Sequence, residues 1–266
     1  MTRLDSIVRA TLLVFLLVPT LNADEPKWKQ LTINGRSEFE AAGVFDVDND
    51  GKLDIVAGDT WYQAPDWKPY HVRDVKRQGS YFNDFATMPL DVNGDGFSDF
   101  VTCSYFAKDV GWVENPGKPG ADWTYHELDV PGNIEAAWMV DLSGDGVPDV
   151  LPNTVNVVVW YEVVKKGDGG KGVDFKKHDL GSAAAGHGVG SGDVNGDGRV
   201  DLLTPKGWFE APANPSHDSW AWHPDWQLGR SAQRAYRSWL ATSMATDFPT
   251  SSTAWATITG FTGCIR

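Results

Sequence analysis

Four short segments of this chain repeat the spacing Asp-x-(Asp/Asn/Ser)-x-Asp-Gly-x-x-Asp, which places oxygen ligands at regular intervals. They occupy residues 46–54, 91–99, 141–149 and 193–201. Side-chain oxygens at positions 1, 3, 5 and 9 and the carbonyl at position 7 can surround a hard cation, and glycine at position 6 permits the sharp turn. Calcium suits such a set because it takes six to eight oxygen ligands. We therefore predict a structural Ca²⁺ ion in each loop, four in all.

The predicted ligands are the residues at positions 1, 3, 5, 7 and 9 of each loop, with position 7 contributing only its carbonyl. Loop by loop they are Asp46, Asp48, Asp50, Lys52 and Asp54; Asp91, Asn93, Asp95, Phe97 and Asp99; Asp141, Ser143, Asp145, Val147 and Asp149; and Asp193, Asn195, Asp197, Arg199 and Asp201. The third loop is the weakest, because its position 3 is a neutral hydroxyl.

These loops could instead be EF-hands or simple turns without a metal. An EF-hand requires a bidentate Glu at position 12, where this chain has Ala57, Thr102, Pro152 and Thr204, and the flanking sequence lacks helical periodicity. Asp, Asn and Gly also form turns between strands without any metal. Turn formation alone gives no reason for Asp at positions 1 and 9 in every copy.

The loops recur with a period that indicates propeller blades. Their starts are 45, 50 and 52 residues apart, within the range of repeated supersecondary units. Each loop follows an apolar segment and precedes a β-rich one, and two further segments rich in aromatics and His complete the unit. Four strands per unit are typical of a propeller blade. We therefore predict an all-β fold with about four recognisable blades, each calcium loop joining the first and second strands.

The loops at 91–99 and 193–201 resemble the FG-GAP or VCBS repeat, which occurs in the integrin α-chain propeller and in many secreted bacterial proteins. The resemblance covers roughly residues 35–228. It implies a calcium-stabilised β-propeller, typically seven-bladed, that serves mostly for extracellular binding and in some members forms part of an enzyme. The literal Phe-Gly and Gly-Ala-Pro signatures are absent, which favours the bacterial branch over the integrin branch.

The amino terminus has the features of a signal peptide. Arg3 and Arg9 precede the apolar residues 10–18 and a polar region that ends at Ala23. We predict cleavage after Ala23 and a secreted or periplasmic protein, with an uncleaved anchor helix as the alternative. No later stretch is apolar enough to span a membrane. Two cysteines, at 103 and 264, do not predict a disulfide framework.

The net charge of −13 argues against a nucleic-acid partner. Thirteen of the carboxylates lie in the four loops, so four divalent cations would bring the net charge from −13 to −5. Without metal these clustered charges repel one another. We therefore predict that folding depends on calcium.

Residues outside the loops also recur from repeat to repeat. A polar residue lies six or seven positions ahead of each loop, where the innermost strand begins, and these four should meet at one mouth of a central channel. They are Glu40, Asp84, Glu135 and His187. They could bind a second, catalytic metal or perform acid/base chemistry, or simply line a water-filled channel.

We predict that the recurring tryptophans pack between blades and that the recurring histidines are structural hydrogen-bond partners. These are Trp61, Trp112, Trp160 and Trp208, and His71, His126, His178 and His223.

The repeat pattern stops at about residue 230. Reading codons 241–252 in a shifted frame permits a further Asp-Val-Asn-Gly-Asp-Gly loop starting near position 242, 49 residues after Asp193. We infer a frameshift near residue 230 and predict a signal peptide at 1–23, a propeller at 24–229 and an aberrant, poorly packed tail at 230–266. An ordered helix over residues 231–245 is the alternative.

Two functional classes fit these patterns. The favoured one is a secreted, non-enzymatic calcium-binding module that recognises a protein or a polysaccharide through loops on one face. The other is a carbohydrate-active enzyme, similar to the sugar-dehydrating lyases built on such propellers, with the four inner-strand residues around a channel metal. A non-functional fragment is the third option, since four blades of a seven-bladed parent form an open arc; closure with four or five blades is the geometric alternative. No nucleophile, phosphate loop or Ser/His/Asp arrangement is evident.

Overall fold

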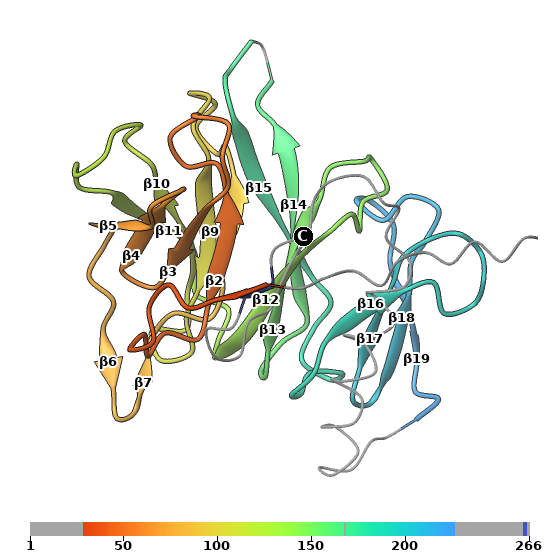
Figure 1. Ribbon diagram of the computed structural model, residues 1–266. Coiled ribbons are helices and arrows are strands. Elements are labelled where there is room, and N and C mark those ends of the chain that lie inside the picture. Colours follow the sequence, from red (N-terminus) through yellow and green to blue (C-terminus); the bar gives the residue numbers. More distant parts are fainter. Residues whose placement is uncertain (1–28, 168, 227–262, 265–266) are drawn as a thin grey trace, which may run out of the picture.

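The computed structural model describes residues 29–167, 169–226 and 263–264, and these residues form strands, turns and loops without a helix. The predicted signal peptide lies outside the described residues. So do almost all residues that bear on the frameshift hypothesis and on its helical alternative. The all-β prediction is confirmed for the described part of the chain (Figure 1).

Four antiparallel sheets of four strands follow one another along the chain, and we call them blades 1 to 4. Blade 1 contains β2 (Ala42–Phe45), β3 (Asp54–Ala57), β4 (Thr60–Gln63) and β5 (Lys68–His71); blade 2 contains β8 (Met88–Leu90), β9 (Asp99–Cys103), β10 (Val110–Glu114) and β11 (Thr124–Asp129); blade 3 contains β12 (Ile134–Val140), β13 (Asp149–Thr154), β14 (Val159–Lys165) and β15 (Val173–Asp179); blade 4 contains β16 (Gly190–Gly192), β17 (Asp201–Thr204), β18 (Gly207–Glu210) and β19 (Ala221–His223). Within each sheet the strands pair in chain order. Each acidic loop, numbered 1 to 4 like its blade, joins the first and second strands as predicted.

Two small sheets lie outside the blades. Strand β6 (Arg77–Gln78) pairs with β7 (Tyr81–Phe82) in the link between blades 1 and 2. Strand β1 (Gln30–Leu31) pairs with β20 (Gly263–Cys264), which falls in the predicted tail. No helix long and apolar enough to cross a membrane occurs in the described part of the chain.

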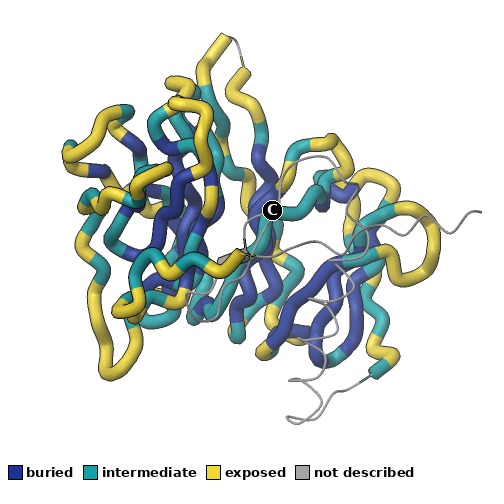
Figure 2. Tube along the Cα trace, in the orientation of Figure 1, coloured by how far each residue is buried: buried dark blue, intermediate teal, exposed yellow. Residues whose placement is uncertain are grey.

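The second strand of each blade forms the centre of the core. Every residue of β3, β9, β13 and β17 is buried, whereas the residues of the fourth strands are exposed or half-buried (Figure 2). The buried clusters cross blade boundaries: Trp61 of blade 1 packs with Phe100 and Trp123 of blade 2, and Trp160 of blade 3 packs with Phe209 of blade 4. The prediction that the recurring tryptophans pack between blades is therefore confirmed for Trp61 and Trp160.

The blades succeed one another in an open row. Figure 1 shows blades 1 and 2 on the left, blade 3 in the centre and blade 4 on the right. No sheet among the described residues joins blade 4 to blade 1. The described residues therefore form an open arc of blades and not a closed propeller.

Candidate metal sites and inner-strand cluster

The four loops share one backbone conformation. Positions 4 and 6 both have positive φ in every loop, a conformation that glycine adopts without strain and that asparagine tolerates better than most residues. At position 4 these are Asn49 (59°), Gly94 (75°), Gly144 (77°) and Gly196 (78°), and at position 6 Gly51 (83°), Gly96 (93°), Gly146 (87°) and Gly198 (86°). The chain therefore turns identically four times.

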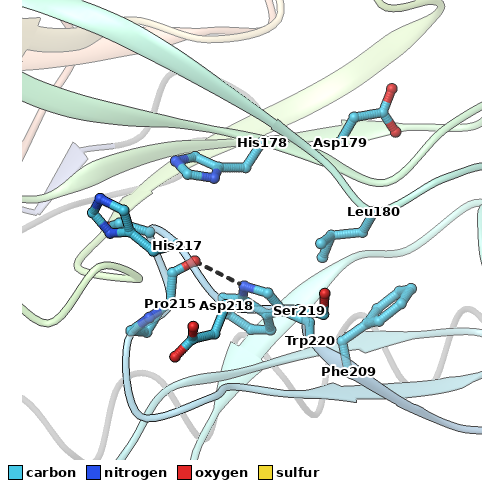
Figure 3. Close-up of a pocket in the computed structure, with 10 residues that line it drawn as sticks. His178, Asp179, Leu180, Phe209, Pro215, His217, Asp218, Ser219 and Trp220 are labelled. Atoms are coloured by element: carbon cyan, nitrogen blue, oxygen red, sulfur yellow. Dashed lines mark hydrogen bonds between the residues drawn. The ribbon is translucent and has the colours of Figure 1, made fainter.

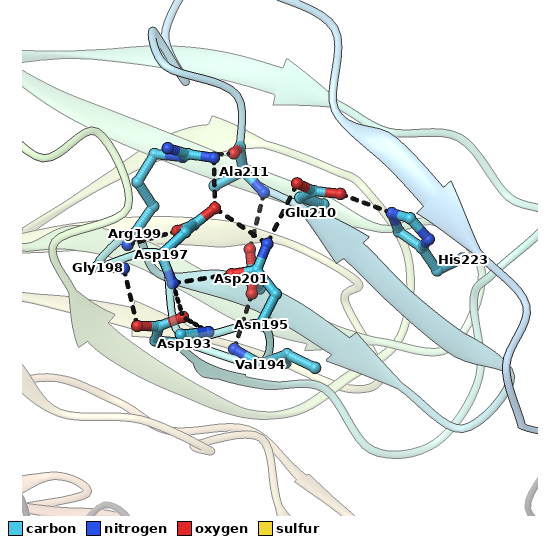
Figure 4. Close-up of polar contacts among 11 residues, drawn as sticks. Asp193, Val194, Asn195, Asp197, Gly198, Arg199, Asp201, Glu210, Ala211 and His223 are labelled. Atoms are coloured by element: carbon cyan, nitrogen blue, oxygen red, sulfur yellow. Dashed lines mark hydrogen bonds and ion pairs between the residues drawn. The ribbon is translucent and has the colours of Figure 1, made fainter.

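The position-1 aspartate holds each loop closed. One of its carboxylate oxygens accepts the backbone N–H of position 6 in all four loops, at 2.9, 3.0, 2.9 and 2.8 Å from loop 1 to loop 4. Figure 4 shows this bond in loop 4, from Gly198 to Asp193. Such bonds from side chain to backbone stabilise the turn of each loop.

The donor set of loop 1 fits a calcium ion. Carboxylate oxygens of Asp46, Asp48 and Asp50 all lie within 4.8 Å of one another. Ligands at about 2.3–2.6 Å from a common Ca²⁺ show this spread. The basic residue at position 7 makes an ion pair with the position-5 carboxylate in loops 1 and 4, Lys52 with Asp50 and Arg199 with Asp197. These exposed pairs contribute little to stability, so a divalent cation would displace them at small cost.

The position-9 aspartate is a buried staple. The side chains of Asp54, Asp99, Asp149 and Asp201 are fully buried. One oxygen accepts the N–H of loop position 2, at 3.1, 2.9, 2.9 and 2.8 Å from loop 1 to loop 4. The other accepts an N–H at or just beyond the third strand, from Ala64, Asn115, Val163 and Ala211 at 2.7, 2.8, 2.9 and 2.8 Å. Each oxygen has two lone pairs, so the predicted role as a metal ligand is compatible with the staple and stays a prediction.

Burial also raises the pKa of these staple carboxyls. The pKa of Asp99 and of Asp149 rises to about 6, chiefly because burial disfavours the charged form, and backbone N–H bonds oppose the rise. The pKa values of Asp54 and Asp201 are raised for the same reason. A bound cation would favour the ionised form.

The metal-free protein is expected to become more stable when the pH falls from 7.5 to 5. A native pKa of about 6 for Asp99 and Asp149, against the ordinary value of 3.8, means that the folded state binds more protons between these values. The stabilisation is therefore complete below pH 3.8 and lost as the pH rises through about 6. His178, whose pKa burial lowers, acts in the opposite sense below its ordinary value of 6.5.

Urea unfolding in EDTA across this pH range measures the effect. In saturating Ca²⁺ the increase on acidification should shrink to the part contributed by buried Asp84, whose pKa is also raised to about 6, because the ion holds the staple carboxyls ionised. Stability in EDTA that instead rises steadily from pH 5 to 7.5 would contradict the prediction.

Hydrogen bonds connect the loops to neighbouring blades. In loop 1 the Val47 carbonyl accepts a bond from Asn115 Nδ2 of blade 2 at 2.8 Å, and Asn49 Nδ2 donates to the Gly96 carbonyl of loop 2 at 2.9 Å. The carbonyl of Val92 in loop 2 accepts the N–H of Val173 in blade 3 at 2.9 Å. Loops 1 and 2 thus lie at blade boundaries.

The structure brings part of the inner-strand set together. Glu135 Oε2 lies 3.1 Å from His187 Nδ1, although the two belong to different blades. Burial raises the pKa of Glu40, and the charge of Glu135 adds to the rise, so Glu40 is within electrostatic reach of Glu135. Asp84 differs: it is fully buried in an ion pair with Arg73, and burial raises its pKa to about 6 against the opposing effect of that charge. Catalysis by any of the four stays a prediction.

Residues that the sequence analysis left unassigned connect loops and outer strands. Gln63, Glu114 and Glu210 end the third strands of blades 1, 2 and 4, and each bonds to the position-3 side chain of its loop. Their signal in the sequence is a Trp-x-Glu/Gln segment in each repeat.

The predicted role of the histidines is confirmed for three of them, each bonded to a third-strand Glu: His126, His178 and His223. The prediction is wrong for His71, which pairs with exposed Asp74 because Tyr70 takes its place on the strand.

Two clefts lie where the fourth strand of one blade meets the next blade. The cleft between blades 3 and 4 has a volume of about 340 Å³ and is lined by His178, Asp179, Phe209, His217 and Trp220, among others (Figure 3). The cleft between blades 1 and 2, of about 430 Å³, is lined by residues that include Arg73, Asp122 and Trp123. Both combine aromatic rings with carboxylates and other hydrogen-bonding groups.

Residues 91–151 match the family model of the FG-GAP-like repeat, from the start of loop 2 to just beyond loop 3. No curated protein matches the sequence. Among solved structures, the chain is similar to an Agrocybe aegerita lectin that specifically recognises non-reducing terminal N-acetylglucosamine (TM-score 0.40, 17% identity, covering 71% of this chain and 54% of that one). It is also similar to the V. cholerae biofilm matrix protein Bap1 (TM-score 0.35, 18% identity, covering 70% and 30%). The chain thus spans about half or less of the length of these proteins.

Proposed function

We propose that this chain, which carries an FG-GAP-like repeat, is a secreted calcium-stabilised module that binds a protein or polysaccharide ligand. The observation that carries the proposal is the turn that recurs in all four acidic loops, together with the carboxylate oxygens of loop 1, whose spacing suits Ca²⁺. The ions fix blades whose boundaries carry the two clefts. Pockets with aromatic walls and a few convergent polar groups are the usual place of ligand binding.

A carbohydrate-active enzyme is the second candidate. The contact between Glu135 and His187, with Glu40 nearby, supports it, because a carboxylate and an imidazole at one site can exchange protons with a substrate. Of these residues only Glu135 lies within a strand, β12, and none of the three lines either cleft.

Binding to a glycan and protein-ligand array in Ca²⁺ tests the first candidate. His217 and Asp218 are exposed in the cleft between blades 3 and 4, so His217→Ala with Asp218→Ala should abolish binding without unfolding the protein. Glu127→Ala, at an equally exposed site on β11 of blade 2, is the control and should bind normally. No binding to any probe in Ca²⁺ would count against the module. Release of unsaturated sugar products, lost in Glu135→Gln, would favour the enzyme instead.

A further inference from the structure

Three blades share a clamp made of Trp, His and Glu. A fourth-strand His stacks on a third-strand Trp, with ring centroids 4.2, 3.9 and 4.3 Å apart in blades 2, 3 and 4. The Nε2 atom of that His lies 2.8, 2.7 and 2.8 Å from a carboxylate oxygen of the Glu two residues after the Trp. The clamp thus fixes one oxygen of each Glu.

In blades 2 and 4 the second carboxylate oxygen of that Glu faces the acidic loop of the same blade. Asn93 Nδ2 donates to Glu114 Oε1 at 3.4 Å, and Asn195 Nδ2 donates to Glu210 Oε1 at 3.1 Å (Figure 4). An amide whose nitrogen is held in this way keeps its oxygen turned into the loop. There the Asn oxygen accepts the N–H of position 5, at 2.9 Å in loop 2 and 3.1 Å in loop 4.

Blade 1 makes the same connection with donor and acceptor exchanged. Position 3 is Asp48, which can only accept, and its partner is Gln63, whose Nε2 donates to it. The other end of that amide accepts a hydrogen bond from the hydroxyl of Tyr70 at 3.3 Å. Tyr70 replaces His as the ring stacked on Trp61, with centroids 4.9 Å apart. Three residues have thus changed together, and the bonding is preserved.

Blade 3 lacks the connection. Its position 3 is Ser143, whose short hydroxyl bonds to Asp141 within the loop. The Oε1 atom of Glu162 instead accepts a bond from Ser216 of blade 4 at 2.9 Å. The clamp to His178 is intact, so blade 3 provides a natural control.

We propose that Gln63, Glu114 and Glu210 are positioning residues for the calcium sites, and that each is matched to position 3 of its loop: Glu to Asn, and Gln to Asp. Each matched pair carries one formal negative charge and orients an oxygen of position 3 toward the ion. This inference rests on the proposed calcium binding. Partners of this kind commonly change metal affinity by about 10- to 100-fold.

Hydrogen–deuterium exchange of the full chain, titrated with Ca²⁺, tests the matching. The peptide over residues 193–201 reports loop 4, and that over 141–149 in the same molecule is the reference. Glu210→Gln and Glu210→Asp should each raise the calcium concentration for half-maximal protection of loop 4 by about 10- to 100-fold. The Asp variant keeps the charge but is too short to hold both partners. Asn195→Asp combined with Glu210→Gln recreates the blade 1 pair and should restore the wild-type midpoint.

Glu162→Gln is the matched control, since it alters the same clamp without a contact to loop 3. It should leave the midpoint of loop 3 unchanged. A wild-type midpoint in Glu210→Asp would show that charge alone matters and would overturn the proposal, as would an equal shift of loop 3 in Glu162→Gln. Absence of calcium-dependent protection in every wild-type loop would overturn calcium binding itself, a failure distinct from that of the matching.

Discussion

Removing calcium is expected to abolish most of the folded stability of this protein at pH 7.5. A ligand present at about 100 times its dissociation constant stabilises the folded state by about 2.7 kcal/mol per site, so the simple sum over four loops would be roughly 11 kcal/mol. Typical domains are stable by only about 5–15 kcal/mol. The thirteen loop carboxylates would repel one another once the ions leave.

Circular dichroism during heating, in saturating Ca²⁺ and in EDTA, measures this loss. The melting temperature should fall by tens of degrees or the transition should vanish, and readdition of Ca²⁺ should restore it. Mg²⁺ at the same concentration is the control and should restore little, because it demands a tighter octahedral site and dehydrates reluctantly. Equal melting curves in Ca²⁺ and EDTA would contradict structural calcium.

Replacing the buried position-9 aspartate of a loop should lower the free energy of unfolding more than replacing an exposed predicted ligand of the same loop. Asp201→Ala leaves the N–H groups of Val194 and Ala211 without their acceptor, and each bond is 2.8 Å in the intact protein. An unsatisfied buried donor costs about 1–3 kcal/mol, so we expect a loss of about 2–6 kcal/mol in free energy of unfolding, measured with urea in saturating Ca²⁺.

Asp197→Ala in the same loop is the matched variant, because Asp197 is an exposed position-5 residue. Its loss should be reversed by raising the Ca²⁺ concentration, since only affinity is affected, whereas the loss in Asp201→Ala should persist. Amide exchange at Ala211 gives a local measure, faster in Asp201→Ala and unchanged in Asp197→Ala. If both variants respond alike to added Ca²⁺, Asp201 acts as a ligand only.

The blades could be predicted from the sequence because their signals are local and repeated. Turn residues at fixed positions, such as Gly51 and Gly198, and alternating apolar segments define each strand pair without knowledge of the rest of the chain. The burial of Trp160 follows from the same repetition, because a Trp recurs at this position in every blade.

Contacts that depend on the placement of separate blades could not be predicted. The repeat pattern groups Asp84 with the inner-strand residues, but the linker after blade 1 brings Arg73 to it, and only the folded chain shows this ion pair. Glu135 lies at an irregularity in the pairing of β12 with β13, between Ile134 and Ala137, which local patterns do not reveal. The backbone bonds of Asp201 could not be predicted either, because a sequence pattern does not show which carboxylate oxygens accept backbone N–H groups.

The bonds between loops make the row of blades behave like a chain of coupled neighbours. In such arrays stability is the sum of each unit and its interfaces, and order propagates from one unit to the next. Loop 2 receives a bond from loop 1 at Gly96 and binds blade 3 through Val92. An ion bound in loop 2 would therefore affect the stability of three blades, and its loss would let local unfolding spread in both directions along the row.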